Sequence, residues 1–454
     1  MLNIGRIYSI DIAVKIKNAQ KRVFFLYLDG FFVLLPLTKK GKCYIITLIV
    51  FFCGKTAKIE AEKQTMKNER VAILDIRSFE ITFLIGAKGF NSSYVICGEA
   101  TEEYEGYSAQ GFLDEDAFES AVRSVVFSVL KTYRGKLDKI YVGTPSPFIR
   151  LRTIGQNLPF SKRKKISALD IETLFDYGQN EVAEEGRCIR RSAMYFAVGN
   201  NNRYLSEEEL LGTQSASLRG GLCYYFAEDK FCEMVERALQ DFAFSEIVFL
   251  PTSLAESEYL LTKRQRCGYA VLVDVGYLTS TVSVVYGDGI VHEKCFTGGI
   301  AEIVYYLTKR FGVETEEAEN ILGCSNIAAG DDKLDEPWTG ENGISIPVAA
   351  INDVIEYGVD QLCDHINRFL NERYKNKDVL MANNTIWITG EGVDKIRGIA
   401  DHISRRLDRN IKVLSPDLAY NDQPSQSSRL ALLAMAISNK QKKKRLKLFG
   451  GKRK

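Results

Sequence analysis

The chain has 454 residues, of which 46% are hydrophobic and 26% charged, and its net charge is +2. A chain of this length and composition is globular, has more than one domain and can bury ample cores, but its charge does not indicate a class of partner. Ten cysteines without a CxxC pair and three scattered histidines argue against a zinc site and against a disulfide framework. We therefore expect buried thiols in a reducing cytosol.

Residues 1–65 differ in pattern from the rest of the chain. Their two apolar runs, Val23–Leu37 and Tyr44–Gly54, are shorter than the roughly 20 residues of a bilayer-spanning helix. We find no signal-peptide cleavage site after them. Because Met66-Lys-Asn-Glu-Arg is typical of a chain start, we expect residues 1–65 to be an over-extended gene start. A membrane-associated segment and a small extra domain are the alternatives.

Residues 67–144 predict one half of an α/β layer. Val71–Gly89 reads as a strand that ends near Asp75, a turn through Arg77 and Ser78, and a second strand. The helix predicted next, Asp114–Arg134, has apolar residues at i, i+3, i+4 and i+7, and Asp114 is suited to cap it.

A more polar stretch, 146–219, follows and predicts a small α+β module. A helix is expected at Ser167–Gly178, and strands are expected at Met194–Val198 and Ser215–Leu218. The basic run Ser161–Lys165 fits a solvated face better than a nucleic-acid contact. The chain then returns to the first layer, with strands predicted at 222–227 and 245–250 and a helix between them.

The stretch Tyr269–Gly299 reads as a β-hairpin followed by a third strand, with Asp288-Gly289 as a hairpin signal. Its first turn carries Asp274, Gly276, Thr279 and Ser280. Glycine lets a backbone approach a phosphate closely, amides and hydroxyls donate, and a carboxylate can hold a metal through water. The alternative is an ordinary hairpin with a polar turn.

Two further stretches bear on this choice. Val71–Gly89 repeats the layout of strand, aspartate, turn and strand, which predicts an internally duplicated architecture. Thr385–Gly398 is a strand that runs through Thr389-Gly390-Glu391-Gly392 into a helix, an arrangement suited to nucleotide contacts.

The three stretches, in this order and spacing, resemble the two phosphate motifs and the adenosine motif of the actin-like ATPase superfamily. Within it the chain is most similar to the FtsA family of bacterial cell-division proteins. The resemblance runs from about residue 70 to about residue 437. It includes Leu250–Ala255 and Ser427–Ala436, which resemble the two connecting helices, and the polar stretch at 146–219, where FtsA relatives carry an extra subdomain.

This resemblance implies an α/β fold, namely a duplicated, ribonuclease H-like ATPase fold with two lobes and an FtsA-type inserted α+β subdomain. The first lobe would comprise 66–145 and 220–265, and the insert 146–219. The second lobe would comprise 266–437, with a small subdomain at about 300–380, and a basic tail, 438–454, would follow it.

The resemblance also implies ATP and Mg²⁺ as ligands. Carried over position by position, the nucleotide-binding set is Asp75, Arg77, Ser78, Asp274, Gly276, Thr279, Glu319, Gly390, Glu391 and Gly392. Arg77, Tyr277 and Leu278 replace glycines of the family pattern, and a conformation that only glycine adopts easily costs another residue roughly 1–2 kcal/mol. One interpretation is a pseudo-ATPase, and the other is an ATP-binding protein with slow hydrolysis. No catalytic residue and no side-chain metal ligand is assigned.

The tail Ser438–Lys454 carries nine Lys and Arg residues with Leu446, Leu448 and Phe449 among them. Such a segment binds anionic lipid, with about 1 kcal/mol from each charge near the surface. FtsA relatives end in an amphipathic membrane helix, so we predict that the membrane contact comprises Arg445, Leu446, Lys447, Leu448 and Phe449. A solvated basic tail is the alternative.

The resemblance implies an FtsA-like cytoskeletal adaptor in cell division. It would lie on the cytoplasmic face of the cell membrane, self-associate, tether the FtsZ ring at the septum and bind no nucleic acid. Another actin-like adaptor, such as a pilus-assembly protein, is an alternative of the same fold. An active actin-fold ATPase or sugar kinase is an alternative of another class, but it requires intact phosphate turns and a catalytic acid that we cannot find.

Overall fold

The computed structural model describes residues 9–16, 19–28, 31–36, 70–89, 93–182, 184–199, 202–328, 337–340, 343–374 and 385–450. The chain divides into two compact units, Met1–Asn68 and Glu69–Lys454. The first unit holds one antiparallel sheet of three strands, β1 (Ser9–Ile16), β2 (Ala19–Leu28) and β3 (Phe31–Pro36). The apolar run at 44–54 lies outside the described residues, and the over-extended gene start stays a prediction.

The first lobe of the second unit is built on a five-stranded sheet in the order β14-β9-β4-β5-β6. Its strands are β4 (Val71–Ile76), β5 (Glu80–Lys88), β6 (Tyr94–Glu103), β9 (Lys139–Thr144) and β14 (Glu246–Pro251). A short hairpin, β7 (Tyr107–Ser108) and β8 (Gly111–Phe112), precedes α2 (Glu115–Leu130). As predicted, the Asp114 carboxylate caps α2 by accepting a hydrogen bond from the Ala117 N–H, and buried valines on α2 cover the sheet. The helices α5 (Asp229–Leu239) and α6 (Thr252–Leu260) complete the lobe.

The second lobe repeats this topology in the order β17-β16-β15-β20-β21. Its strands are β15 (Ala270–Val275), β16 (Thr279–Tyr286), β17 (Gly289–Thr297), β20 (Ile386–Thr389) and β21 (Ile411–Val413). In both lobes the first strand pairs antiparallel with the second and parallel with the fourth, because each lobe opens on a hairpin and later returns through a helix. The predicted internal duplication is therefore confirmed.

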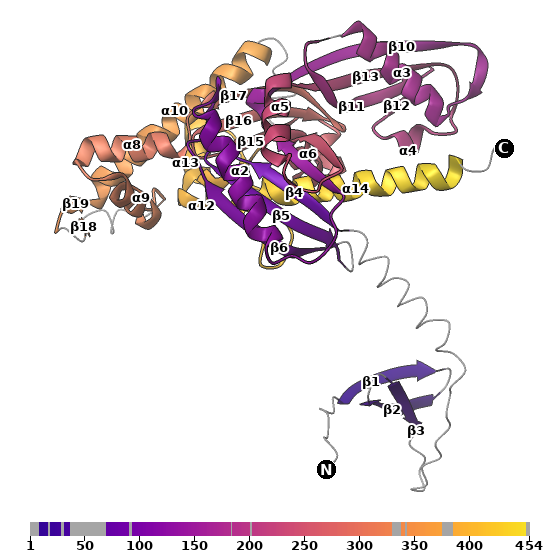
Figure 1. Ribbon diagram of the computed structural model, residues 1–454, viewed down its shortest axis with the longest axis horizontal. Coiled ribbons are helices and arrows are strands. Elements are labelled where there is room, and N and C mark those ends of the chain that lie inside the picture. The colour runs from indigo at the N-terminus through magenta and orange to yellow at the C-terminus, as the bar shows by residue number, and fades with distance from the viewer. Residues whose placement is uncertain are drawn as a thin grey trace. The chain divides into compact units, whose positions relative to one another are not determined.

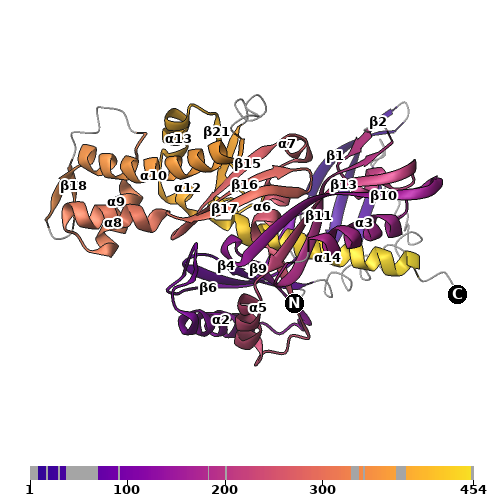
Figure 2. The same cartoon turned by 90° about the horizontal axis from the view of Figure 1, so that it is seen from above.

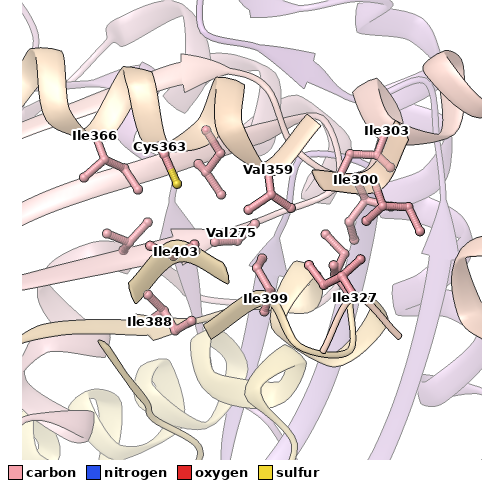
Figure 3. Close-up of a cluster of buried hydrophobic side chains, with 14 of the residues drawn as sticks. Val275, Ile300, Ile303, Ile327, Val359, Cys363, Ile366, Ile388, Ile399 and Ile403 are labelled. Carbon is pink, nitrogen blue, oxygen red and sulfur yellow. The ribbon is translucent and has the colours of Figure 1, made fainter. Parts of the chain in front are cut away.

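Helices and one small hairpin cover the second sheet. The hairpin consists of β18 (Pro337–Thr339) and β19 (Ser345–Pro347), and the helices are α7 (Lys263–Arg266), α8 (Ile300–Phe311), α9 (Thr315–Cys324), α10 (Val348–Tyr374), α12 (Glu391–Lys395) and α13 (Ile399–Leu407). Figure 3 shows how this lobe is held together: side chains of α8, α10 and α13, among them Val359, Cys363 and Ile403, pack with Ile388 of β20 in the sheet. Burying each such side chain contributes about 1.5–3 kcal/mol, which fixes the turns at the sheet's end.

Between β9 and β14 the chain forms an inserted subdomain, drawn in magenta in Figure 1. After the 3-10 turn η2 (Ser146–Phe148), four strands pair in the order β10-β13-β11-β12, and α3 (Ala168–Glu181) and the short α4 (Glu207–Leu210) accompany them. The strands are β10 (Ile149–Lys165), β11 (Arg187–Val198), β12 (Asn202–Tyr204) and β13 (Gln214–Ala227). The strand expected at 222–227 in the first lobe is instead the end of β13, because its residues pair with both β10 and β11. The basic run at 161–165 lies on β10.

The last helix, α14 (Ser427–Gly450), follows the 3-10 turn η4 (Pro424–Gln426). Its first half is a largely buried core element that packs on α6 and on the first sheet through Leu430, Leu432 and Leu433. Its second half continues without a break beside the inserted subdomain, as Figures 1 and 2 show, and Arg190 of β11 donates to Asn439. The sequence analysis expects a closing helix up to residue 437 and a separate tail at 438–454. The structure instead has one continuous helix from Ser427 to Gly450. In the part of the chain that the structure describes, no helix is long and apolar enough to cross a membrane.

Candidate functional site

The candidate site lies where two hairpin turns, one from each lobe, face each other above the start of α14. The first turn links β4 to β5 and is closed by the Arg77 N–H, which donates to the Glu80 carbonyl at 2.9 Å. The second links β15 to β16 and is closed in the same way by the Gly276 N–H, which donates to the Thr279 carbonyl at 3.1 Å. Because Asp75 and Asp274 precede the two turns at equivalent strand positions, the duplicated topology brings both carboxylates into one cleft.

Arg77 fills the centre of this cleft. Its guanidinium donates at 3.1 Å to the Ser428 hydroxyl and at 3.1 Å to the Ser425 carbonyl. It also forms an ion pair with Asp274 at 3.5 Å, and its side chain is only 7% exposed. One side chain from the first lobe therefore ties together the second lobe, η4 and α14, at the place where the sequence analysis expects phosphate.

The acidic groups around Arg77 are perturbed by burial. Burial raises the pKa of Asp75, although attraction to Arg77 and the 2.5 Å hydrogen bond from the Ser428 hydroxyl oppose this effect. Burial also raises the pKa of Asp274, again against the attraction of Arg77. For Arg77 burial alone would lower the pKa, but Asp274 and Asp75 outweigh it, so its pKa lies above its usual range. The cation is therefore permanently charged and holds two carboxylates in a poorly hydrated place.

Several polar groups of the turns are already hydrogen-bonded within the protein. The backbone N–H of Leu278 donates across the lobes to the Ser78 hydroxyl at 3.0 Å, and the N–H groups of Arg77 and Gly276 close their own turns. The carbonyl of Arg77 accepts from the Tyr104 hydroxyl at 2.8 Å. A phosphate would have to displace these partners before it could be bound by the amides of Arg77, Gly276 or Leu278.

The mouth of the cleft is closed by the second departure from the glycine pattern, Tyr277. Its ring stacks on Phe79 of the opposite turn, with ring centroids 4.4 Å apart. Its hydroxyl donates to Glu319 of α9, and the Lys395 ammonium lies 5.2 Å from its ring centroid. Glu319, expected on the ribose side of a nucleotide, therefore has a protein partner in this arrangement.

The third predicted segment packs against the second turn. Gly390 has φ +98°, and a Cβ there would lie 2.0 Å from the Asp274 carboxylate. A Cβ on Gly392 would lie 2.4 Å from the side chain of Val275. Between them, Glu391 forms an ion pair with Lys395 at 2.7 Å. The two glycines are thus required by contacts within the protein, with or without a nucleotide.

The space left inside the cleft is small. A cavity of about 30 Å³ is lined by residues that include Arg77, Ser78, Asp274, Gly276, Thr279, Glu256 and Ser428. This volume accommodates one or two water molecules and is far too small for a nucleoside triphosphate. The residues present therefore do not fit ATP in this closed arrangement. Among the described residues, no cluster of three or more His, Cys, Asp or Glu side chains is placed to hold a metal ion.

Sequence reasoning missed two residues that complete this cleft. Glu256 of α6 is 2% exposed, and its Oε1 has no hydrogen-bond partner in the described part of the chain. Burial and then repulsion by Asp274 raise its pKa well above its ordinary value, which favours the neutral acid. Ser428 connects Asp75 to Arg77. Glu256 follows the stretch Leu250–Ala255, and Ser428 lies in the stretch Ser427–Ala436. The resemblance of these two stretches to connecting helices was the only sequence feature that pointed to either residue.

The predicted membrane residues, Arg445–Phe449, lie on the last turns of α14, well apart in sequence from the cleft. The structure describes the helix there but not its side chains, so the membrane contact stays a prediction.

Comparison with known proteins supports the fold described above. No protein-family model matches the sequence, and no curated protein matches it significantly. Among solved structures, the PilM–PilN type IV pilus biogenesis complex matches with a TM-score of 0.53 and 14% identity, over 81% of this chain and 98% of that one. This likeness shows that the chain has an actin-like α/β fold with two lobes.

Other matches are more distant. MreB 5 of Spiroplasma citri, solved with bound AMPPNP, gives a TM-score of 0.48 at 10% identity, over 84% of this chain and 98% of that one. The ethanolamine utilization protein EutJ from Carboxydothermus hydrogenoformans gives 0.45 at 11% identity, over 83% of this chain and 98% of that one. PilM is therefore the structure among these three whose likeness supports the fold.

Proposed function

We propose that this chain is an actin-fold adaptor that acts by binding other proteins, and that it does not turn over ATP efficiently. The observation that carries this proposal is the position of Arg77. Its guanidinium bridges the lobes through Asp274, Ser425 and Ser428, where a bound nucleotide would otherwise connect them. With Tyr277 and Phe79 stacked at the mouth, the closed state of the cleft is stabilised by the chain itself.

A second candidate function, ATP binding as an assembly switch, has one observation in its favour. Three buried polar atoms at or beside the cavity, Asp75 Oδ1, Ser253 Oγ and Glu256 Oε1, have no hydrogen-bond partner in the described residues. Leaving such a group without a hydrogen bond costs about 1–3 kcal/mol. A state with an open cleft, in which water reaches these groups, recovers this free energy. ATP would bind such an open state only after the Arg77 contacts break.

The likeness to PilM supports a pilus-type or comparable membrane-linked assembly as the setting. The PilM structure is a complex with PilN, so a protein partner of that kind is the first to test. The FtsA-like role at the septum, with FtsZ as partner and with self-association, stays a prediction from the sequence resemblance. The basic end of α14 is proposed to bring the adaptor to an anionic membrane surface on its cytoplasmic side.

Calorimetry with ATP and Mg²⁺ on the full chain tests the nucleotide part of this proposal. We expect no binding up to about 1 mM, the weak end of ordinary substrate affinities. The double variant Arg77→Gly/Tyr277→Gly restores glycine at two of the three departures, and we expect it to gain affinity if it stays folded by circular dichroism. Micromolar binding with steady hydrolysis by the unchanged protein would contradict the proposal.

Sedimentation and vesicle experiments test the adaptor part. We expect self-association to be the same with and without ATP, because the cleft is closed by the chain's own residues. Co-sedimentation with vesicles containing phosphatidylglycerol should fall when Lys442, Lys443, Lys444 and Arg445 are changed to Gln, by about 1 kcal/mol for each charge. Equal binding to neutral and anionic vesicles, or unchanged binding by the Gln variant, would remove the membrane role.

A further inference from the structure

A second, larger cavity lies outside the nucleotide-type cleft, between the inserted subdomain and the second lobe. Its volume is about 480 Å³, and its walls are the start of β10, the middle of β17 and the end of α10. The β10 wall is Ile149–Thr153 without Arg150, and the β17 wall is Val291–Cys295. Volumes of this size hold small molecules or several residues of a peptide.

Both strands that line this cavity are sheet edges. In the described part of the chain, β10 pairs with β13 on one side only, and β17 pairs with β16 on one side only. An edge strand directs alternate N–H and C=O groups outward, and these groups can pair with an added strand. The five residues of β17 that line the cavity span roughly 16 Å at 3.3 Å per residue, which suits a short extended segment.

The charged side chains of the cavity are mostly cationic. Lys294 of β17 and Arg373 of α10 are exposed and form no ion pair with a carboxylate in the described residues, whereas Arg152 of β10 is paired with Glu184. The one carboxylate of the lining, Glu293, accepts from the Ser283 hydroxyl at 3.0 Å. Lys294 and Arg373 together outweigh Glu293, so the net charge of the groove is positive and the complementary ligand is acidic.

We propose that this groove binds an extended, acidic segment of a partner protein, which adds as a strand to the outer edge of β17 and places carboxylates against Lys294 and Arg373. The backbone would supply affinity through main-chain hydrogen bonds, and the two cations would select acidic side chains. This inference rests on the proposed adaptor function and specifies the chemistry of its partner. It does not involve the cleft around Arg77, so each can fail without the other.

A peptide selection tests the proposal even though the partner is unidentified. A library of random octapeptides displayed on phage is selected against the full chain, and the enriched peptides are synthesised. Their affinities are then measured by fluorescence anisotropy for the unchanged protein, for Lys294→Glu/Arg373→Glu, and for Lys309→Glu/Arg310→Glu as a matched control on an exposed face of α8. Each peptide is also made with alternate backbone amides methylated, which removes strand pairing but keeps the charge.

We expect enriched peptides to be rich in Asp and Glu, to bind at least tenfold more weakly to Lys294→Glu/Arg373→Glu, and to bind the α8 control variant unchanged. Methylation should also weaken binding at least tenfold. Hydrogen exchange at 149–153 and 291–295 should slow when the peptide is bound. Failure to enrich acidic peptides, equal affinity for both double variants, or indifference to methylation would overturn the proposal. If no peptide bound and Lys294→Glu/Arg373→Glu lost self-association, the groove would be an interface between two copies of this chain. That result would also overturn the proposal of an acidic partner segment.

Discussion

The two hairpin turns have the same backbone layout but use it in different ways. In the first, Ile76 pairs with Ile81 across the turn, and in the second Val275 pairs with Ser280, so Arg77 and Gly276 occupy the same position. The arginine side chain enters the cleft, whereas a Cβ on the glycine would lie 2.5 Å from the Thr279 carbonyl oxygen of its own turn. At the next position Ser78 accepts from the Leu278 amide, whereas Tyr277 stacks on Phe79. The two copies of the turn thus contact each other through different side chains.

This difference predicts that the first turn contributes more to stability than the second. Arg77→Ala would leave Asp75 and Asp274 buried without their cation, which costs about 3–5 kcal/mol when a buried pair loses one partner. Urea denaturation of the full chain measures this loss. The control is Arg237→Ala, because Arg237 is 53% exposed in an ion pair with Glu119, and exposed pairs contribute at most about 1 kcal/mol. Similar losses for the two variants would mean that the buried network does not hold the lobes together.

The next largest effect is expected at Gly390, which supports the second turn from behind. Gly390→Ala requires φ +98° and places a Cβ against Asp274, so we expect a loss of about 2–4 kcal/mol in unfolding free energy. Gly212→Ala is the matched control, because Gly212 has φ +83° but open space around its Cβ position. The control should lose only about 1–2 kcal/mol from backbone strain. If both variants lost the same amount, contact with Asp274 would not be the reason for glycine.

The aromatic closure of the second turn is expected to contribute less. Tyr277→Ala removes the stack on Phe79, and aromatic pairs contribute about 0.5–1.5 kcal/mol beyond the area they bury. Thermal unfolding of this variant is compared with that of Tyr305→Ala, since Tyr305 is 55% exposed on the same lobe. A Tyr277→Ala variant as stable as the Tyr305 control would show that the mouth of the cleft is not held shut by this stack.

The smallest effect, a pH dependence, concerns Glu256 beneath the two turns. Burial raises its pKa above the unfolded value of 4.5, so the folded chain keeps a proton that the unfolded chain has lost. Its contribution to stability is fully present below the unfolded pKa and is lost as the pH rises toward the folded pKa. Between pH 5 and 8, stability should therefore fall more with rising pH than in Glu256→Gln, whose side chain stays neutral. Glu185→Gln, at a side chain that is 94% exposed, should follow the unchanged protein, and parallel pH profiles for all three would contradict the assignment.

Local patterns of the sequence predicted much of this fold. The α2 cap at Asp114 and the apolar face of that helix follow from capping chemistry and apolar spacing, which act over a few residues. The residues expected at the site do gather around the two turns, because the order of motifs reflects the duplicated topology. The assignment of 222–227 to the first lobe was wrong, since strand pairing with β10 depends on contacts that no local pattern records.

The sequence also could not predict that Arg77 fills the cleft, because its contacts join residues far apart in the chain. A residue other than glycine in a phosphate turn signals a steric conflict with phosphate, but it does not say where the side chain goes. Arg77 meets Ser428, which is 351 residues away, and Glu256 reaches the same place from a connecting helix. Only the folded chain shows where the Arg77 side chain goes. It lies between the Asp274 carboxylate of the second turn and the Ser428 hydroxyl of α14.

The continuous α14 has a mechanical consequence. Ser428, which joins Asp75 to Arg77, lies in the first turn of the same 24-residue helix whose other end carries the basic residues. A helix of that length is a stiff rod of about 36 Å. One continuous helix therefore holds the basic C-terminal end at a fixed distance from Ser428 and the cleft.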